Sequence, residues 1–248
     1  MGRTLLIDIS NSATKLAGTD GEVLSEKRLV ATRELDVVIV EKIAAELGVD
    51  RAVLSSVVPD VSGVVRQVFG GGVLEVAHGI ELGVEIDYPE PGTIGQDRLA
   101  NSAALGALYG APGVVIDFGT AVTFDILSAG GGKNGTYVGG VIAPGLEVMT
   151  DYLYQRTAQL PKIDLLEPEE VVGKSTRSAM MAGAVLGYRG LVREILASIR
   201  EEIGGGVEVA TVATGGYASL ISAKVPEVGE VNENLTLEGL RIIGNLNS

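Results

Sequence analysis

A segment in which an apolar run ends in aspartate occurs twice in this chain, and this repeat constrains the fold more than any other feature. Residues 5–14 read LLIDISNSAT and residues 114–123 read VVIDFGTAVT, a constant offset of 109 positions. The apolar residues, the aspartate, a small residue two positions later and the threonine coincide. Because the offset is close to the length of a small domain, the repeat predicts two related domains that face each other across a cleft. The alternative is chance similarity between two strand-turn segments.

Apolar periodicity and frequent glycines predict short strands and helices in both halves of the chain. The first half has strand patterns at 5–9, 13–18, 22–30, 51–56 and 73–77 and helix patterns at 33–47, 60–69 and 97–109. The second half has strand patterns at 136–142 and 207–214 and helix patterns after residue 144 and at 175–203. This order is typical of mixed sheets with helices on their faces, so we expect an α/β protein. The break at Ala111-Pro112-Gly113 predicts a domain boundary between residues 1–110 and 111–248.

Composition excludes several functional classes. The 248 residues include 19 Lys and Arg against 32 Asp and Glu, and the net charge of −13 disfavours proteins that wrap nucleic acid or bind anionic membranes. The absence of cysteine excludes disulfides, thiolate metal sites and cysteine nucleophiles. The single histidine, His78, stands before Gly79, a setting more typical of a turn than of a catalytic base. No apolar run is long enough to span a bilayer and no export signal is visible, so we expect a soluble cytoplasmic protein.

The aspartate of the first copy stands where phosphate chemistry is common. Asp8 ends a predicted strand and precedes the turn Ser10-Asn11-Ser12, with Lys15 three positions further on. Small turn residues let backbone amides approach phosphate oxygens, and a carboxylate at a strand end can hold a hydrated Mg²⁺. The segment therefore predicts a phosphate and magnesium site. The alternative is an Asx-type turn that closes a hairpin.

The aspartate of the second copy occupies the equivalent place in the second half of the chain. Asp117 is followed by Gly119 and Thr120. Two aspartates, one from each domain, can assemble a phosphoryl-transfer site if they converge on a cleft. Because two like charges near each other are costly unless a cation compensates them, the pair predicts bound metal or potassium. The alternative is two unrelated turn aspartates.

The segment Gly95-Gln96-Asp97-Arg98 opens a predicted helix and is the most informative short segment of the chain. Arg98 has the geometry to clamp a phosphate or carboxylate, and Gly95 permits close approach of a ligand. An aspartate beside a substrate hydroxyl can accept its proton as a phosphoryl group moves. Asp97 is therefore a candidate proton acceptor, and the alternative is a plain helix cap.

Six motifs follow one another along the chain, at residues 8–15, 95–98, 117–121, 139–145, 175–176 and 213–216. Together they resemble the motifs of the type III pantothenate kinases, members of the acetate and sugar kinase, Hsp70 and actin superfamily. The resemblance covers nearly the whole chain. It implies two ribonuclease-H-like (actin-like ATPase) domains, each with a mixed five-stranded sheet flanked by helices, usually in a homodimer.

The resemblance also implies an activity, its substrates and the roles of individual residues. The activity is ATP-dependent phosphorylation of pantothenate to 4′-phosphopantothenate, the first step of coenzyme A biosynthesis, with Mg²⁺ and a monovalent cation, K⁺ or NH₄⁺. Asp97 is then the catalytic proton acceptor, Asp117 holds the monovalent cation, and Asp8 holds Mg²⁺ through phosphate or water. The residues implied in ATP binding are Asp8, Ser10, Asn11, Ser12, Lys15 and Thr120, and those implied in pantothenate binding are Tyr88, Gly95, Gln96, Asp97, Arg98 and Thr176.

The first phosphate loop departs from the family pattern. The family normally has Asp-x-Gly-Asn-Thr, whereas this chain has Asp8-Ile9-Ser10-Asn11-Ser12. Ser10 adds a side chain where glycine permits positive φ, and Ser12 lacks the methyl group that restrains threonine. Both changes predict weaker ATP binding, although neither removes a charged group. The Ser10 change leaves open a non-catalytic regulator that kept the fold. A further alternative is a kinase of the same superfamily that acts on a sugar or a small acid.

Overall fold

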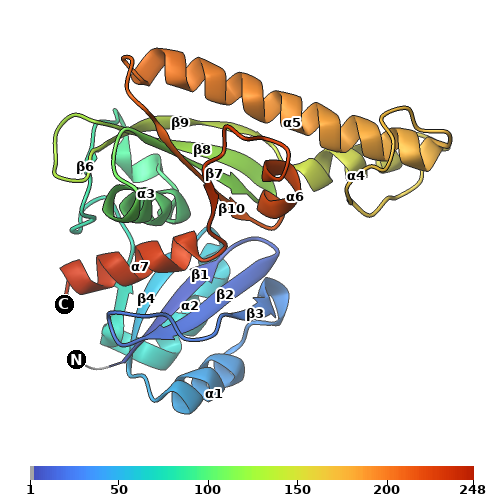
Figure 1. Cartoon of the computed structure of the whole chain (residues 1–248). Coiled ribbons are helices and arrows are strands. Elements are labelled where there is room, and N and C mark those ends of the chain that lie inside the picture. Colours follow the sequence, from blue (N-terminus) through green and yellow to red (C-terminus); the bar gives the residue numbers. More distant parts are fainter. Residues whose placement is uncertain (1–2) are drawn as a thin grey trace. The chain divides into compact units, whose positions relative to one another are not determined.

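The computed structural model describes residues 3–248, and Figure 1 shows the course of the chain. The chain divides into two compact units. The first comprises the described residues up to Ala111 together with Leu127–Gly139 and Asn234–Ser248, and the second comprises Pro112–Ile126 and Gly140–Glu233. Two later segments thus return to the first unit. The division into residues 1–110 and 111–248 stays a prediction.

The first sheet contains five strands in the order β3-β2-β1-β4-β5. β1 runs antiparallel to β2 and parallel to β4, while β3 and β5 form the two edges. The strands are β1 (Thr4–Ile9), β2 (Ala13–Thr19), β3 (Arg28–Ala31), β4 (Arg51–Ser56) and β5 (Val73–Glu75). Parallel and antiparallel pairs therefore occur in one sheet, as the mixed strand pattern predicted.

The second sheet repeats this topology and adds one strand, in the order β11-β10-β7-β8-β9-β6. Read from β9 to β11, the order matches that of the first sheet from β3 to β5. β1 and β7 begin and end 109 residues apart, so the repeat found in the sequence is confirmed as a structural repeat. The strands are β6 (Glu85–Ile86), β7 (Gly113–Phe118), β8 (Ala121–Ser128), β9 (Thr136–Pro144), β10 (Ala210–Gly215) and β11 (Glu230–Val231).

The sixth strand, β6, is absent from the sequence prediction of five strands. It is only two residues long and pairs in parallel with the start of β9. The amides of Glu85 and Asp87 donate to the carbonyl oxygens of Gly135 and Tyr137 at 3.1 and 2.9 Å. Backbone pairing of so short a segment leaves no period-two apolar pattern in the sequence, which is why the strand could not be predicted.

The two faces of β1 are buried differently, and this difference positions Asp8. Leu5, Ile7 and Ile9 point into an apolar core with α1 (Val37–Leu47) and α2 (Pro59–Phe69). Since successive side chains of a strand alternate between faces, Leu6 and Asp8 lie on the opposite face. The carboxylate of Asp8 therefore avoids the core that the helices α1 and α2 cover.

The second unit repeats this arrangement around β7. Val114, Ile116 and Phe118 of β7 join the core that α5 (Thr176–Ile203) covers, so Asp117 lies on the opposite face. The buried face of α5 has helical spacing and is formed by Val185, Tyr188, Val192, Leu196 and Ile199. Each copy of the repeat thus turns its aspartate away from its apolar core.

Capping by a side chain explains where α1 begins. α1 starts four residues later than predicted, because the Asp36 carboxylate accepts a hydrogen bond from the Ile39 amide at 2.8 Å and caps the helix there. α2 starts with Pro59 in its first turn. The remaining helices are α3 (Gln96–Leu108), α4 (Leu146–Arg156), α6 (Ala218–Ser222) and α7 (Leu235–Leu246). Among the described residues, none of the helices combines the length and apolar character needed to cross a bilayer.

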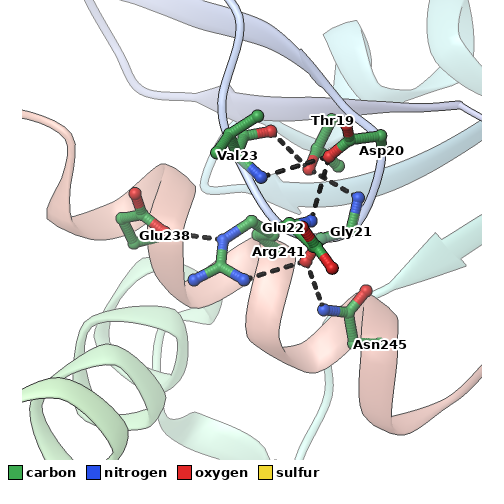
Figure 2. A network of polar contacts seen from close by, with 8 residues as sticks. All are labelled: Thr19, Asp20, Gly21, Glu22, Val23, Glu238, Arg241 and Asn245. Carbon is green, nitrogen blue, oxygen red and sulfur yellow. Dashed lines mark hydrogen bonds and ion pairs between the residues drawn. The ribbon is translucent and has the colours of Figure 1, made fainter.

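The last helix, α7, completes the first unit, although the sequence patterns did not predict it. Figure 2 shows Arg241 and Asn245 of α7 donating hydrogen bonds to the carbonyl oxygen of Gly21, at 3.0 and 2.7 Å. The Gly21 carbonyl belongs to a turn that Asp20 closes by accepting from the amides of Glu22 and Val23. This turn replaces the first part of the strand predicted at 22–30, so β3 begins only at Arg28.

α7 also packs closely on α3 through a glycine. A Cβ atom on Gly239 would collide with the backbone of Ala100 in α3. A buried hydrogen bond from Thr236 Oγ1 to Asn101 Oδ1, 2.9 Å long, joins the same two helices. The two helices can therefore approach this closely only because position 239 has no side chain.

We predict that Gly239→Ala destabilises the protein, because the added methyl group must push α7 away from α3. The expected loss is about 1–3 kcal/mol in the free energy of unfolding, measured with guanidinium chloride. Gly63→Ala is the matched control, since Gly63 lies in the helix α2 with open space around it. That control should gain up to about 1 kcal/mol from helix propensity. Equal stability of the two variants would contradict the close packing.

Candidate active site

Asp8 is buried at the carboxyl end of β1 and is compensated by charge and hydrogen bonding. Its side chain is 2% exposed. Lys15 Nζ lies 3.3 Å from Asp8 Oδ2, and Ser55 Oγ donates to Asp8 Oδ1 at 3.2 Å. These partners come from both neighbouring strands, since Asp8 pairs with Lys15 of β2 and with Ser55 of β4. A buried carboxylate needs such partners, and this set holds it fixed in one orientation.

The turn after β1 accommodates its serines without strain. Ser10 donates its amide to the Ala13 carbonyl at 3.3 Å, and Thr32 Oγ1 donates to the Ser10 carbonyl at 2.7 Å. Among the described residues, only glycines adopt positive φ. Ser10 therefore has an ordinary backbone conformation, and the turn does not require glycine there. Asn11 and Ser12 follow on the exposed part of the same turn.

The first turn of α3 is attached to the first sheet at the carboxyl end of β4, next to the end of β1. Gln96 Oε1 accepts a hydrogen bond of 2.7 Å from the amide of Ser56, the last residue of β4. Ser55, the preceding residue, is the one that contacts Asp8. The start of α3 and the Asp8 carboxylate are thus both anchored at the carboxyl end of β4. The structure brings these two predicted motifs together within the first unit.

Asp97 is turned back over the start of α3. Its Oδ1 atom accepts a 2.9 Å hydrogen bond from the Arg98 amide. A Cβ atom on Gly95 would lie 2.5 Å from the same Oδ1, so glycine leaves the space that the carboxylate occupies. Positive potential at a helix N-terminus favours a carboxylate there. Asp97 is only partly buried, so it is held in place yet accessible.

A second cluster in the first unit joins Arg98 of α3 to two tyrosines, Tyr137 and Tyr88. The guanidinium carbon of Arg98 lies 5.7 Å from the ring centroid of Tyr137, and the rings of Tyr137 and Tyr88 are 6.1 Å apart. Tyr88 and Arg98 are predicted site residues, whereas Tyr137 was not predicted. It lies on β9, inside a strand that was predicted, but nothing in the sequence indicated that its ring would meet Arg98.

In the second unit, Asp117 lies against the last two residues of β10. Asp117 pairs in register with Thr214, and a Cβ atom on Gly215 would lie 2.6 Å from Asp117 Oδ1. Gly215 adopts φ +91°, a conformation that favours glycine. The hydroxyl of Thr214 is buried and has no hydrogen-bond partner among the described residues. A carboxylate beside a buried hydroxyl fits the oxygen donor set that a monovalent cation prefers.

Thr120 is exposed in the turn between β7 and β8, where the Gly145 amide donates to its carbonyl oxygen at 3.0 Å. The junction between β9 and α4 is stabilised by Tyr188, whose hydroxyl donates to the Pro144 carbonyl at 3.0 Å. Burial raises the pKa of Tyr188 to about 12, so this phenol stays protonated at neutral pH. Thr176 is exposed in the first turn of α5, where Ser175 caps the helix.

Each predicted site residue is thus placed within its own unit. Asp8, Lys15, Gln96 and Asp97 gather at one edge of the first sheet, while Asp117, Thr120 and Thr176 belong to the second unit. His78, for which the sequence favoured a turn position, is exposed. The convergence of Asp8 and Asp117 on one cleft stays a prediction.

Solved structures with the same fold span nearly the entire chain. A Baf family protein from Campylobacter jejuni aligns with a TM-score of 0.59 at 17% identity, and the alignment covers 97% of each chain. A glucokinase from an Antarctic psychrotroph aligns with a TM-score of 0.53 at 8% identity, over 99% of each chain. At such low identity these likenesses show the fold alone. They confirm the predicted α/β fold of the sugar kinase and actin type.

Sequence comparison is more specific. Residues 4–198 match the family model described as type III pantothenate kinase. A type III pantothenate kinase of Akkermansia muciniphila is 48% identical over 248 residues, which cover 98% of both chains. That of Methylacidiphilum infernorum is 42% identical over 98% of this chain and 88% of its own length. By the family model, and by relatives that match from end to end, this chain belongs to the type III pantothenate kinase family.

Proposed function

We propose that this protein transfers the γ-phosphoryl group of ATP to the primary hydroxyl of pantothenate. The product is 4′-phosphopantothenate, and the reaction is the first step of coenzyme A biosynthesis. The observation that carries the proposal is the 48% identity, over 98% of the chain, to a protein named type III pantothenate kinase. Because ATP and pantothenate are metabolites of the cell interior, we place the enzyme in the cytoplasm.

Asp97 is the residue that we assign to proton transfer. Phosphoryl transfer needs little covalent help from the protein, so the protein mainly positions the hydroxyl and accepts its proton. The bond from the Arg98 amide holds Asp97 Oδ1 in a fixed place at the start of α3. Gln96 attaches this turn to the carboxyl end of β4, and this contact fixes the position of the Asp97 carboxylate relative to the first sheet.

The remaining pantothenate contacts follow from the same turn and its neighbours. The Arg98 guanidinium pairs with the carboxylate of pantothenate, because charge-assisted hydrogen bonds to a carboxylate are strong and directional. The Tyr88 ring lies 6.1 Å from the ring of Tyr137, over which the Arg98 guanidinium lies, and we include Tyr88 among the pantothenate contacts. Gly95, Gln96 and Thr176 complete the proposed set of contacts.

ATP and its cations are assigned to the two aspartate turns. Asp8, Ser10, Asn11, Ser12 and Lys15 of the first turn, with Thr120 of the second, bind the phosphates. Asp8 holds Mg²⁺ through phosphate or water, and Asp117 with Thr214 holds K⁺ or NH₄⁺. When bound, these cations neutralise negative charge on the phosphates. The ordinary φ of Ser10 supports the phosphate role, because serine there leaves the turn unstrained.

We further propose that the protein is a homodimer that uses an exposed apolar stripe on α4. Four apolar side chains of that helix lie on one face at i, i+1, i+4 and i+5 spacing and are each 39–58% exposed; they are Val148, Met149, Tyr152 and Leu153. An exposed apolar stripe of this kind is typical of an interaction surface. A second copy of the chain offers an identical stripe and can cover it.

We predict that Asp97→Asn lowers kcat for pantothenate phosphorylation by about 10²–10⁴-fold, because the amide cannot accept the hydroxyl proton. The measurement is a coupled ADP-release assay with pantothenate, Mg²⁺ and K⁺. Asp60→Asn is the matched control, since Asp60 also lies in the first turn of a helix of the first unit. It should leave kcat unchanged. Near-normal turnover of Asp97→Asn would refute the role.

The same assay separates the alternative functions. Wild-type protein that releases no ADP above background would favour a non-catalytic regulator. ADP release with a sugar or acetate-like acid, but not with pantothenate, would identify a different acceptor. Either result would overturn the proposal.

We predict that Gly95→Ala lowers kcat by about tenfold or more while the melting temperature stays near that of the wild type. The new methyl group would meet the Asp97 carboxylate at 2.5 Å, and this flexible side chain yields before the backbone does. Gly92→Ala is the control, because the nearest atom to its Cβ would be His78 Cε1 at an ordinary 3.6 Å. Wild-type kcat in Gly95→Ala would show that the observed place of Asp97 is not needed.

For the dimer, we predict twice the chain mass by light scattering on a sizing column. The double variant Tyr152→Glu/Leu153→Glu should shift the mass to that of one chain, because charges on the stripe oppose its burial. Val38→Glu, at a 69% exposed position on α1, should leave the dimer intact. A wild-type monomer, or a dimer that survives the double substitution, would contradict the assigned surface.

A further inference from the structure

We infer that Tyr137 is a positioning residue that holds the guanidinium of Arg98 ready for the anionic end of the acceptor substrate. The inference rests on the proposed function, because it assigns Arg98 to the carboxylate of pantothenate. Tyr137 itself need not touch the substrate, since it acts through the orientation of Arg98.

The first observation is that Arg98 lies over a fully buried aromatic ring. Tyr137 is 0% exposed, and the Arg98 guanidinium carbon lies over its ring, 5.7 Å from the centroid. The Tyr137 ring also meets the Tyr88 ring, at a tilt of 58°. The negative potential of an aromatic face attracts a guanidinium placed at this distance. Arg98 therefore has a preferred position before any substrate arrives.

The second observation is that one strand pair fixes both tyrosines. Ile86 of β6 pairs with Tyr137 of β9, and the Asp87 amide donates to the Tyr137 carbonyl at 2.9 Å. Tyr88 follows Asp87 and lies two residues beyond the end of β6. Gly139, two residues beyond Tyr137, faces the Tyr88 ring, so that a Cβ atom there would already be in contact at 3.7 Å. The short strand β6 thus helps to position the Tyr137 ring, over which Arg98 lies, and the Tyr88 ring next to Tyr137.

The physical consequence is preorganisation. A long arginine side chain loses rotamer freedom when it pairs with a ligand, and this loss weakens binding. Because the face of the Tyr137 ring already favours one rotamer of Arg98, the arginine loses less conformational freedom when the substrate binds. The benefit falls on acceptor binding, because Arg98 pairs with the acceptor and Asp97 performs the proton transfer. Loss of the ring should therefore raise KM for pantothenate and leave kcat and KM for ATP nearly unchanged.

The test compares two substitutions at position 137 by steady-state kinetics. Tyr137→Phe keeps the aromatic face and should stay within about twofold of the wild type in every constant. Tyr137→Leu keeps apolar bulk without the face and should raise KM for pantothenate about tenfold. A merely structural role would lower kcat and the melting temperature in Tyr137→Leu and leave KM for pantothenate unchanged; that pattern would overturn the inference.

A series of fluorinated phenylalanines at position 137 covers the case in which Tyr137→Leu fails to fold. Fluorine weakens the negative potential of the ring at nearly constant shape, so KM for pantothenate should rise with each added fluorine. A flat series would overturn the inference. In an Arg98→Lys background, Tyr137→Leu should change KM for pantothenate little, because the ring acts through Arg98. If Tyr137→Leu raised KM in that background as much as it does in the wild type, the coupling would be contradicted.

A readout without substrate separates this inference from the proposed function. The Nε–H resonance of Arg98, assigned by its loss in Arg98→Lys, should carry a ring-current shift that Tyr137→Phe retains and Tyr137→Leu removes. An unshifted resonance would overturn the inference. If the wild type does not phosphorylate pantothenate, the proposed function fails and with it the role of Arg98 in binding pantothenate, while the resonance still decides whether Tyr137 orders Arg98.

Discussion

The parallel pairing of β1 with β4 is the interaction on which the rest of the site depends. It places Asp8 beside Ser55 and leaves the next residue, Ser56, to bind Gln96 at the start of α3. A carboxylate buried to this extent is costly unless its partners are fixed, and Lys15 from the other neighbouring strand completes the set. Sheet register, rather than any loop, thus determines where the proposed phosphate and acceptor motifs of the first unit lie.

The same construction is used twice. β1 and β7 each direct one face into a core covered by helices and present an aspartate on the other face. The two copies have diverged in how they treat that aspartate. Asp8 lies 3.3 Å from the ammonium group of Lys15, and Asp117 lies against Gly215 at the end of β10, next to the buried hydroxyl of Thr214. The difference in surroundings supports two different assignments, phosphate chemistry for Asp8 and a monovalent cation for Asp117.

Much of the fold follows from sequence pattern, because the strands β1, β4 and β7 are short apolar runs with clear ends. The prediction of a helix from residue 33 was wrong by four residues, since the Asp36 cap outweighs apolar spacing. α7 and β6 escaped prediction for a different reason: both depend on partners far away in the chain, Gly21 and Ala100 for α7 and Tyr137 for β6. The motif residues Asp8 and Asp97 could be named from sequence, whereas the contact between Tyr137 and Arg98 arises only from tertiary structure.

The return of α7 to the first unit has a consequence for how the protein is made. The helix that closes the Gly21 turn and packs on α3 is encoded after the entire second unit. The first unit of a nascent chain therefore lacks α7, and it stays incomplete until residues 234–248 have left the ribosome. Contacts of such long sequence separation form late and slow the search for the native state. The first unit is therefore completed only after the entire second unit has been synthesised.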